Sequence, residues 1–334
     1  MAIKALRKLQ LGRETTAGTA VAASTIYRVE NALLKDDRVV VFPGEDVGNM
    51  GGLNRSYTAF LGGSLSMPDH PATFEQILHI FEAGIKTVAT GSADTSGSGK
   101  IYSYPVSTTS ANTIKTYTLE GGDDQQAEEM EYCFVKSFTL SGGPREAVML
   151  GAEWEGRQVT TCNFTTGQTA PTVEEILFSN GSIAINTVAE VVGATVKSNT
   201  LMGFNLNVNT GYQSVPAAQG TSSVFAFVKQ VKPEITLNVT FEHDATSVAE
   251  KAAWRAGTPR QLRLRFIGTA LTTSGTTYSN KELIVDLAGK WESFDVIGEQ
   301  DGNDIVSGTF RAGYDSTAAL FAEFVVVNEL ASVP

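Results

Sequence analysis

Residues 136–142, KSFTLSG, are echoed in the second half of the chain by residues 292–298, ESFDVIG. Both stretches place Ser, Phe and Gly at the same positions, and both alternate apolar with polar residues. Alternation of this kind is typical of a strand with one face in a core. The match predicts that one β unit occurs twice in the chain.

The residues around this strand repeat as well. Residues 64–67, SLSM, match residues 236–239, TLNV, with apolar residues at the same alternate positions. Gly151 to Gly156 matches Gly308 to Gly313 at the same spacing, each on a strand that leaves a tight turn. Duplicated units of this size usually pack by quasi-symmetry, which favours a structural ring or array.

One helix is expected in each copy. In residues 73–84, Thr73 and Gln76 have the spacing of a capping box, the apolar side chains share one face, and Gly84 can provide a left-handed stop. Residues 247–257 follow the same plan with a thinner apolar stripe. The helices therefore belong to the repeat.

Composition places the chain among folded proteins. Its 334 residues are 42% hydrophobic and 18% charged, which suits two domains with cores of their own. We expect an N-terminal arm (1–25), a first β-sandwich domain (26–172) and a second one (173–334). No apolar run is long enough to span a membrane. The formal net charge of −11 argues against tight DNA binding, and two cysteines are too few for a disulfide framework.

Strands in both halves alternate clearly. Residues 202–209 and 235–241 place apolar side chains on one face and mostly Asn and Thr on the other. In residues 148–157 the apolar face runs to Trp154, while Glu153 and Glu155 lie on the opposite face. These carboxylates are candidates for the wall of a channel; ordinary solvent exposure explains them equally well. The pattern predicts antiparallel β-sandwiches.

No motif predicts catalysis. The three histidines lack the spacing of a zinc protease and are not next to a nucleophile motif. Residues 97–100 resemble a phosphate loop only in part, because Asp94 stands where the first Gly is required. The acidic residues 123–131 lack the ligand spacing of a calcium loop. We expect a protein that is not an enzyme and that uses no cofactor or metal.

Four stretches together resemble the major tail tube proteins of long-tailed bacteriophages: residues 9–21, 73–84, 131–142 and 154–159. The resemblance implies a β-sandwich with one flanking helix, in which four strands of each unit join neighbours into a β-barrel ring. The second half enters the resemblance mainly through the duplication. Two such units in tandem are the fold expected here.

The resemblance also implies that rings stack through long hairpin loops, which would be residues 34–54 and 210–222. The candidate ring-stacking residues are Asp36, Asp37, Arg38, Glu45 and Asp46.

By the same resemblance, the chain would be a structural subunit of a virion tail, assembled in the host cytoplasm. Its partners would be further copies of itself, the tape measure protein, the tail terminator and the tail tip proteins, while DNA would pass without specific binding. If both halves contribute barrel strands, three chains make a pseudo-hexameric ring; if the second half is a decoration, six chains are needed. The alternative is a double β-sandwich binding module or adhesin.

Overall fold

The computed structural model describes residues 3–52, 54–218, 220 and 223–334. The chain is mainly β, with large antiparallel sheets and two α-helices, α1 (Ile77–Gly84) and α2 (Ala245–Arg255). Two short 3₁₀ helices, η1 (Lys4–Leu6) and η2 (Phe178–Asn180), complete the helical content of the described residues. The prediction of a mainly β chain with antiparallel sheets and two helices is confirmed.

The strands are, in chain order, β1 (Lys8–Arg13), β2 (Thr25–Tyr27), β3 (Lys35–Asp36), β4 (Val39–Val41), β5 (Tyr57–Phe60), β6 (Gly63–Pro71), β7 (Ser92–Ala93), β8 (Lys100–Pro105), β9 (Tyr117–Gly122), β10 (Ala127–Gly142), β11 (Met149–Gly156), β12 (Val159–Cys162), β13 (Gly181–Thr187), β14 (Val196–Lys197), β15 (Leu201–Asn209), β16 (Tyr212–Val215), β17 (Phe227–Gln230), β18 (Glu234–Glu242), β19 (Arg260–Ala270), β20 (Asn280–Phe294), β21 (Gly298–Gln300), β22 (Asn303–Ala312) and β23 (Ala322–Asn328).

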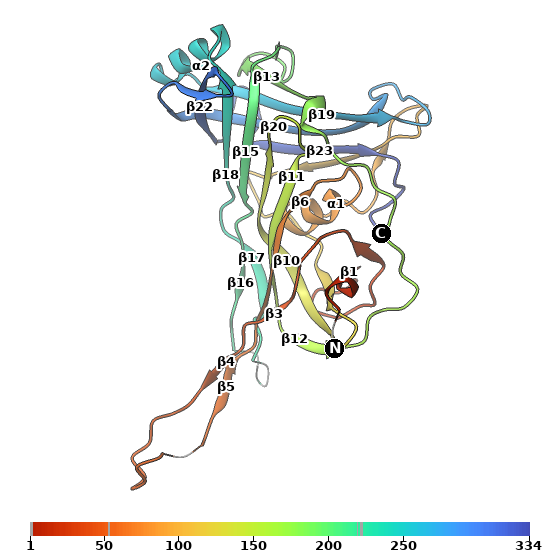
Figure 1. Cartoon of the computed structure of the whole chain (residues 1–334), viewed down its shortest axis with the longest axis vertical. Coiled ribbons are helices and arrows are strands. Elements are labelled where there is room, and N and C mark those ends of the chain that lie inside the picture. Colours follow the sequence, from red (N-terminus) through yellow and green to blue (C-terminus); the bar gives the residue numbers. More distant parts are fainter. Residues whose placement is uncertain (1–2, 53, 219, 221–222) are drawn as a thin grey trace.

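The main sheet runs through both halves of the chain. Its order is β3, β6, β11, β10, β15, β18, β22 and the last part of β20, so it has eight strands. The halves meet where β10 pairs with β15, with Ser137 opposite Asn209 and Gly142 opposite Phe204. In Figure 1 strands β11, β10, β15 and β18 of this sheet can be followed along the long axis of the molecule.

A second sheet crosses the end of the first in Figure 1. Its order is β14, β13, β19, β20, β23, β8 and β7, so it also joins strands of both halves. Strand β20 belongs to both sheets, because residues 282–287 pair with β23 and residues 289–294 pair with β22. The domain boundary after residue 172 remains a prediction. Strands from the two sides of it pair in both sheets, β10 with β15 and β8 with β23.

The N-terminal residues join a smaller group of strands. Strand β1 lies between β2 and β9, and β9 continues to the first part of β10. Residues 8–13 of the predicted arm are therefore held by strand pairing within their own chain.

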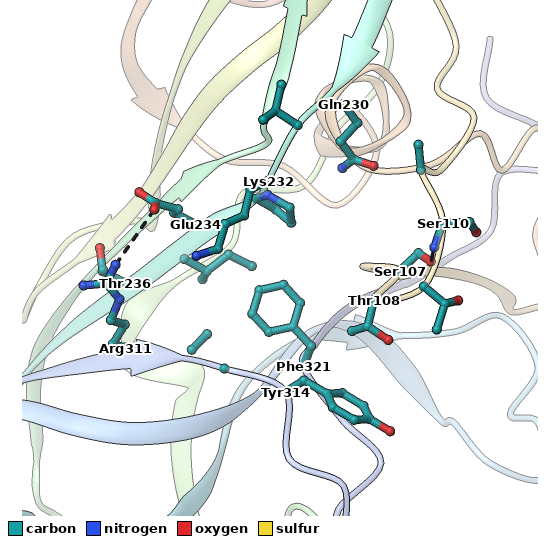
Figure 2. Close-up of a pocket in the computed structure, with 17 residues that line it drawn as sticks. Ser107, Thr108, Ser110, Gln230, Lys232, Glu234, Thr236, Arg311, Tyr314 and Phe321 are labelled. Atoms are coloured by element: carbon teal, nitrogen blue, oxygen red, sulfur yellow. Dashed lines mark hydrogen bonds and ion pairs between the residues drawn. The ribbon is translucent and has the colours of Figure 1, made fainter.

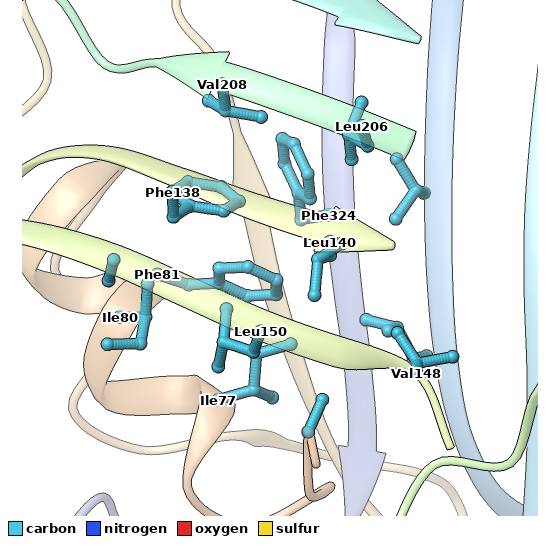
Figure 3. Close-up of a cluster of buried hydrophobic side chains, with 14 of the residues drawn as sticks. Ile77, Ile80, Phe81, Phe138, Leu140, Val148, Leu150, Leu206, Val208 and Phe324 are labelled. Atoms are coloured by element: carbon cyan, nitrogen blue, oxygen red, sulfur yellow. The ribbon is translucent and has the colours of Figure 1, made fainter. Parts of the chain in front are cut away.

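The core lies between the sheets and around α1. The ring of Phe81, on α1, lies 5.5 Å from Tyr104 and from Phe138, and 5.1 Å from Phe324. These side chains come from both sheets and both halves, and each is at most 1% exposed. Figure 3 shows Phe81 and Phe138 packed together beneath β10 and β11. One core therefore holds the two halves together.

The strand register supports the repeat. Leu65 lies opposite Trp154 as Leu237 lies opposite Phe310. Val135 of β10 lies opposite Trp154, and Trp291 of β20 lies opposite Phe310. A β-bulge follows each of them, between Val135 and Ser137 in β10 and between Trp291 and Ser293 in β20. Bulges are designed features of a fold, so their recurrence at one position favours a true duplication.

The predicted match of Gly151 to Gly156 with Gly308 to Gly313 is wrong by one residue. In the structure Trp154 matches Phe310, which places Gly156 at the position of Ala312. Because strand side chains alternate between faces, a one-residue slip would have placed buried Trp154 at the position of exposed Arg311.

The first helix also begins later than predicted. Helix α1 starts at Ile77, not at Thr73, and only half of the predicted capping box forms: the Gln76 N–H donates to the Thr73 hydroxyl at 3.2 Å. The side-chain amide of Gln76 donates to the carbonyl of Ile26 instead, at 3.0 Å, because β2 packs against this turn. Gly84 does not have a positive φ; its lack of a Cβ lets Val135 pack closely.

The second helix begins two residues earlier than predicted, at Ala245, and its N-cap is Asp244, with Ser247 at the third helical position. The backbone N–H of Ser247 donates to the Asp244 carboxylate at 2.9 Å, and the Ser247 hydroxyl accepts from the Asp244 N–H. At the other end Gly257 has a φ of 64°, the left-handed conformation expected from the sequence.

Asp244→Ala is expected to lower the free energy of unfolding by about 1 kcal/mol, because the first turn of α2 loses its capping carboxylate. Urea denaturation measures the difference. Asp244→Asn, which keeps an oxygen acceptor, is the matched control and should lie close to the parent. An equal loss in both variants would show that the cap does not stabilise the helix.

A polar sheet face as the candidate functional surface

The main sheet has one face in the core and one face covered with hydroxyl and amide side chains. The second face follows from the alternation in each strand, since residues directly opposite one another in neighbouring strands share a face. Its Ser, Thr and Asn residues are Ser64, Ser66, Ser137, Thr139, Ser141, Asn205, Asn207, Asn209, Thr236, Asn238, Thr240, Ser293, Ser307 and Thr309.

The two predicted wall residues lie on this polar face. Glu153 is exposed and accepts a hydrogen bond of 2.6 Å from the hydroxyl of Ser66. Glu155 lies 3.0 Å from the ammonium nitrogen of Lys136, which projects from the β10 bulge. Both thus lie on the polar face, Glu153 exposed and Glu155 partly buried, while a channel wall remains a proposal.

The second half carries a matching ion pair with its charges exchanged. A guanidinium nitrogen of Arg311 lies 3.5 Å from Glu292 and another lies 3.8 Å from Glu234. In the repeat, Arg311 stands at the position of Glu155 and Glu292 at that of Lys136. The side chains of the two pairs are 22–54% exposed, so solvent screens both pairs and each contributes at most about 1 kcal/mol to stability.

The predicted ring-stacking residues lie along one long hairpin. Asp36, Asp37 and Arg38 are at its root, where Arg38 donates to Asp36 at 2.7 Å. Glu45 pairs with Arg55 across the hairpin, and Asp46 is exposed further out. Residues 39–52 and 54–60 form a projection that extends well beyond the rest of the molecule in Figure 1.

This first hairpin has an apolar surface without cover. Phe42 is 72% exposed, Tyr57 is 53% exposed and Met50 is fully exposed. By contrast, the second hairpin, which contains β16 and β17, buries Tyr212 and Phe225 against Phe134 of β10. Exposed apolar side chains gathered on one projection mark an interaction surface.

Several ionisable side chains are buried in the core, far from any cleft. Glu82 of α1 is fully buried, takes two hydrogen bonds from Arg13 at 2.6 and 2.8 Å, and takes a third from the Tyr117 hydroxyl at 2.8 Å. The ring of His79 reaches the same hydroxyl at 3.2 Å. Sequence reasoning missed this cluster, which ties β1, β9 and α1 together and has the geometry of a structural network.

Burial lowers the pKa of His79 to about 3, and the nearby Arg13 guanidinium acts in the same direction. The unfolded chain, with a His pKa of about 6.5, then binds more protons than the folded chain between these values. Stability should therefore fall as pH drops below about 6.5, by about 2 kcal/mol from this group at pH 5.

Comparison of urea unfolding at pH 8 and pH 5 in the parent and in His79→Gln measures this contribution. The variant should lose about 2 kcal/mol less on acidification than the parent does. Equal losses in the two proteins would show that another group accounts for the pH dependence.

A recess of about 660 Å³ opens between three segments, residues 107–111, 230–236 and 311–314. Figure 2 shows Phe321 and Tyr314 on one side of it, Ser107, Thr108 and Ser110 opposite, and the Glu234–Arg311 ion pair at the edge. The described lining residues include no His or Cys.

Among the described residues, no helix combines the length and apolarity needed to cross a membrane. No group of three or more His, Cys, Asp and Glu side chains in that part of the chain is placed to hold a metal ion. Compared with models of known protein families and with curated proteins, the chain matches none.

Proposed function

We propose that this protein is a structural subunit of a phage-type tail tube, in which rings of the chain stack around a channel. The observation that carries the proposal is the polar face, because it runs without interruption across two matching strand units in one sheet. A wall of Ser, Thr and Asn side chains is chemically passive. It suits a surface past which a polymer slides.

The sheet ends in two strand edges, and α2 covers part of the β20 edge. The Trp254 indole donates to the Glu292 carbonyl at 3.0 Å, and Lys251 donates to the Asp295 carbonyl at 2.9 Å. Among the described residues, positions 65–71 of β6 pair only with β11, and positions 290–294 of β20 pair only with β22. Val296 follows the end of β20 and is 85% exposed. Its counterpart in the first half, Leu140 of β10, pairs with β15 and is 1% exposed. Edges that lack a further strand, at opposite ends of the sheet, support head-to-tail joining of copies.

Three copies of the eight-stranded sheet would give a barrel of about 24 strands. With strands about 4.8 Å apart and tilted by about 40°, the circumference is about 150 Å and the backbone diameter about 48 Å. Such a barrel leaves an open lumen wide enough for a DNA duplex. A trimer in which both halves provide wall strands is therefore the ring we favour over a hexamer with a decorative second half.

The charge of the wall also suits a conduit. Carboxylates outnumber cations on the polar face, and the chain as a whole carries a formal net charge of −11. A basic wall would hold DNA by releasing counterions, whereas an acidic one does not. The proposal thus includes a tape measure protein and then DNA as occupants, and the terminator and tip proteins as end partners.

Stacking of rings would use the hairpin tips. Both hairpins extend toward the same end of the molecule, the lower end in Figure 1. The outer part of the first hairpin carries Glu45 and Asp46 beside exposed Val47 and Met50. This arrangement supports contact with a ring below. Virion tail is the location that follows from the proposal.

Negative-stain electron microscopy of the concentrated protein tests the function. Tubes or stacked rings with an axial hole are expected. A double β-sandwich binding module is the alternative, and exposed Phe42 and Tyr57 on the first hairpin favour it to some degree. A protein that remains monomeric at high concentration would support the binding module and contradict the tube.

A further inference from the structure

The two long hairpins correspond residue by residue. The first hairpin lies between Lys35 and Ser64, which are opposite one another in β3 and β6. The second lies between Asn207 and Thr236, which are opposite one another in β15 and β18. Each member of the second pair lies 172 residues after its counterpart, so the hairpins have equal length. Asp37 and Arg38 thus match Asn209 and Thr210 of the second hairpin.

The second hairpin docks on the first half of its own chain. Its root is fixed by the N–H of Thr210, which donates to the carbonyl of Lys136 at 3.0 Å. The Tyr212 hydroxyl donates to the carbonyl of Asn112 at 2.8 Å, and the Arg157 guanidinium donates to the carbonyls of Phe225 and Ala226 at 3.1 and 2.9 Å. This docking continues the β10–β15 pairing.

The matching place in the second half is an open recess of about 430 Å³. It is lined by Pro259, residues 289–292 and residues 311–315, and through Arg311 to Tyr314 it adjoins the recess of Figure 2. The first hairpin cannot fill it within the same chain, because β3 and β20 stand at opposite ends of the sheet. Seven strand spacings separate them, about 34 Å.

The charges of the recess complement the root of the first hairpin. By the repeat, Asp37 would lie beside Arg311, as Asn209 lies beside Glu155. In the second hairpin the same position is the neutral Asn209, which faces the Lys136–Glu155 pair. The next residue, Thr210, is buried and bonds through its hydroxyl to the carbonyls of Val135 and Lys136. A carboxylate thus replaces a neutral amide at this position of the first hairpin. Within its own chain Asp37 pairs with Lys35 and accepts from the Ser64 hydroxyl.

The apolar contact differs between the two places. In the first half, Phe134 and Arg157 contact Phe225. In the second half, Lys290 takes the position of Phe134, and Gly313 takes that of Arg157. The aromatic anchor is therefore not repeated. Val40, at the position of Tyr212, is 42% exposed and would enter beside Trp291.

We propose that the root of the first hairpin, residues 37–40, docks into the second-half recess of a neighbouring copy of this chain, in the register of β10 and β15. In that register Asp37 lies opposite Ser293 as Asn209 lies opposite Ser137. The inference rests on the proposed ring. It makes the hairpin root a contact within a ring, and it leaves only the outer part for contact between rings.

A disulfide placed at the predicted contact tests the inference. The double variant Asp37→Cys with Ser293→Cys should form disulfides between copies on mild oxidation, because directly opposite strand residues have Cα atoms about 4.5–5.5 Å apart. Non-reducing electrophoresis should show linked dimers and trimers. The matched control is Ser137→Cys with Asn209→Cys, which should form its disulfide within one chain. The parent, with Cys133 and Cys162, provides the background.

Charge reversal provides a second readout if the cysteine variants fold poorly. Arg311→Asp should lower the fraction of protein in closed rings at least tenfold, and the double variant Asp37→Arg with Arg311→Asp should restore it. Rings without a 37–293 disulfide, and no rescue by the double variant, would overturn the docking while the tube proposal stands. Absence of any ring in the parent would overturn both.

Discussion

Replacement of residues 40–57 by a short Asn-Gly turn is expected to leave a folded monomer that no longer assembles. This part of the first hairpin is mostly exposed and forms a separate two-stranded sheet of β4 and β5, so its removal uncovers little of the core. Its exposed apolar side chains would be covered only by other copies. Size-exclusion chromatography with light scattering measures the loss of assembly, and thermal unfolding measures the fold.

The second hairpin provides the control for this deletion. Shortening it by removal of residues 213–226 should destabilise the monomer itself, because Phe225 packs against Phe134 within the same chain. Loss of a buried aromatic side chain costs about 3–5 kcal/mol. Assembly by the shortened first-hairpin variant at parental concentration would show that the hairpin is not a contact between copies.

Arg13→Ala is expected to lower the free energy of unfolding by about 3–5 kcal/mol, since it leaves a buried carboxylate without its cation. The Glu82 side chain is fully buried, and Arg13 provides two of its hydrogen bonds. Burial lowers the pKa of Arg13, but the hydrogen bonds and the negative charge of Glu82 raise it by more, so the pKa of Arg13 lies above its usual value. Urea denaturation at pH 7 measures the loss.

An exposed ion pair supplies the comparison. Lys4 and Glu30 lie 3.3 Å apart with side chains 63% and 80% exposed, so Lys4→Ala should change stability by less than about 1 kcal/mol. If Arg13→Ala and Lys4→Ala have similar effects, the buried cluster does not hold β1 to α1.

Much of the strand content was predictable because alternation is a local property. The faces of residues 202–209 and 235–241, and the exposure of Glu153 opposite buried Trp154, follow from a period of two. The Asp301-Gly302 pair was predictable as a tight turn, and both residues have positive φ between β21 and β22.

Long-range contacts were not predictable in the same way. Nothing local in residues 280–294 shows that β20 serves two sheets, and the pairing of β10 with β15 joins segments whose partners are set by the whole fold. The start of α1 depends on the contact of Gln76 with Ile26. The Arg13–Glu82 pair joins residues 69 positions apart, which no motif spacing reports.

The repeat was visible, but its register needed the structure. Glycine spacing aligned the strands one residue away from their true match, because glycine marks a backbone requirement and not a face. With the register known, the exchange of charges between the Lys136–Glu155 and Glu292–Arg311 pairs becomes apparent. The candidate recess for a neighbouring hairpin depends on that register.

The mass of the smallest closed ring tests the central claim most directly. Native mass spectrometry of the purified assembly, together with electron microscopy of the same sample, provides it. The account predicts three chains of 35.6 kDa per ring around an axial hole. Six chains per ring would remove the second half from the wall, and a chain that forms no ring at any concentration would contradict the tube itself.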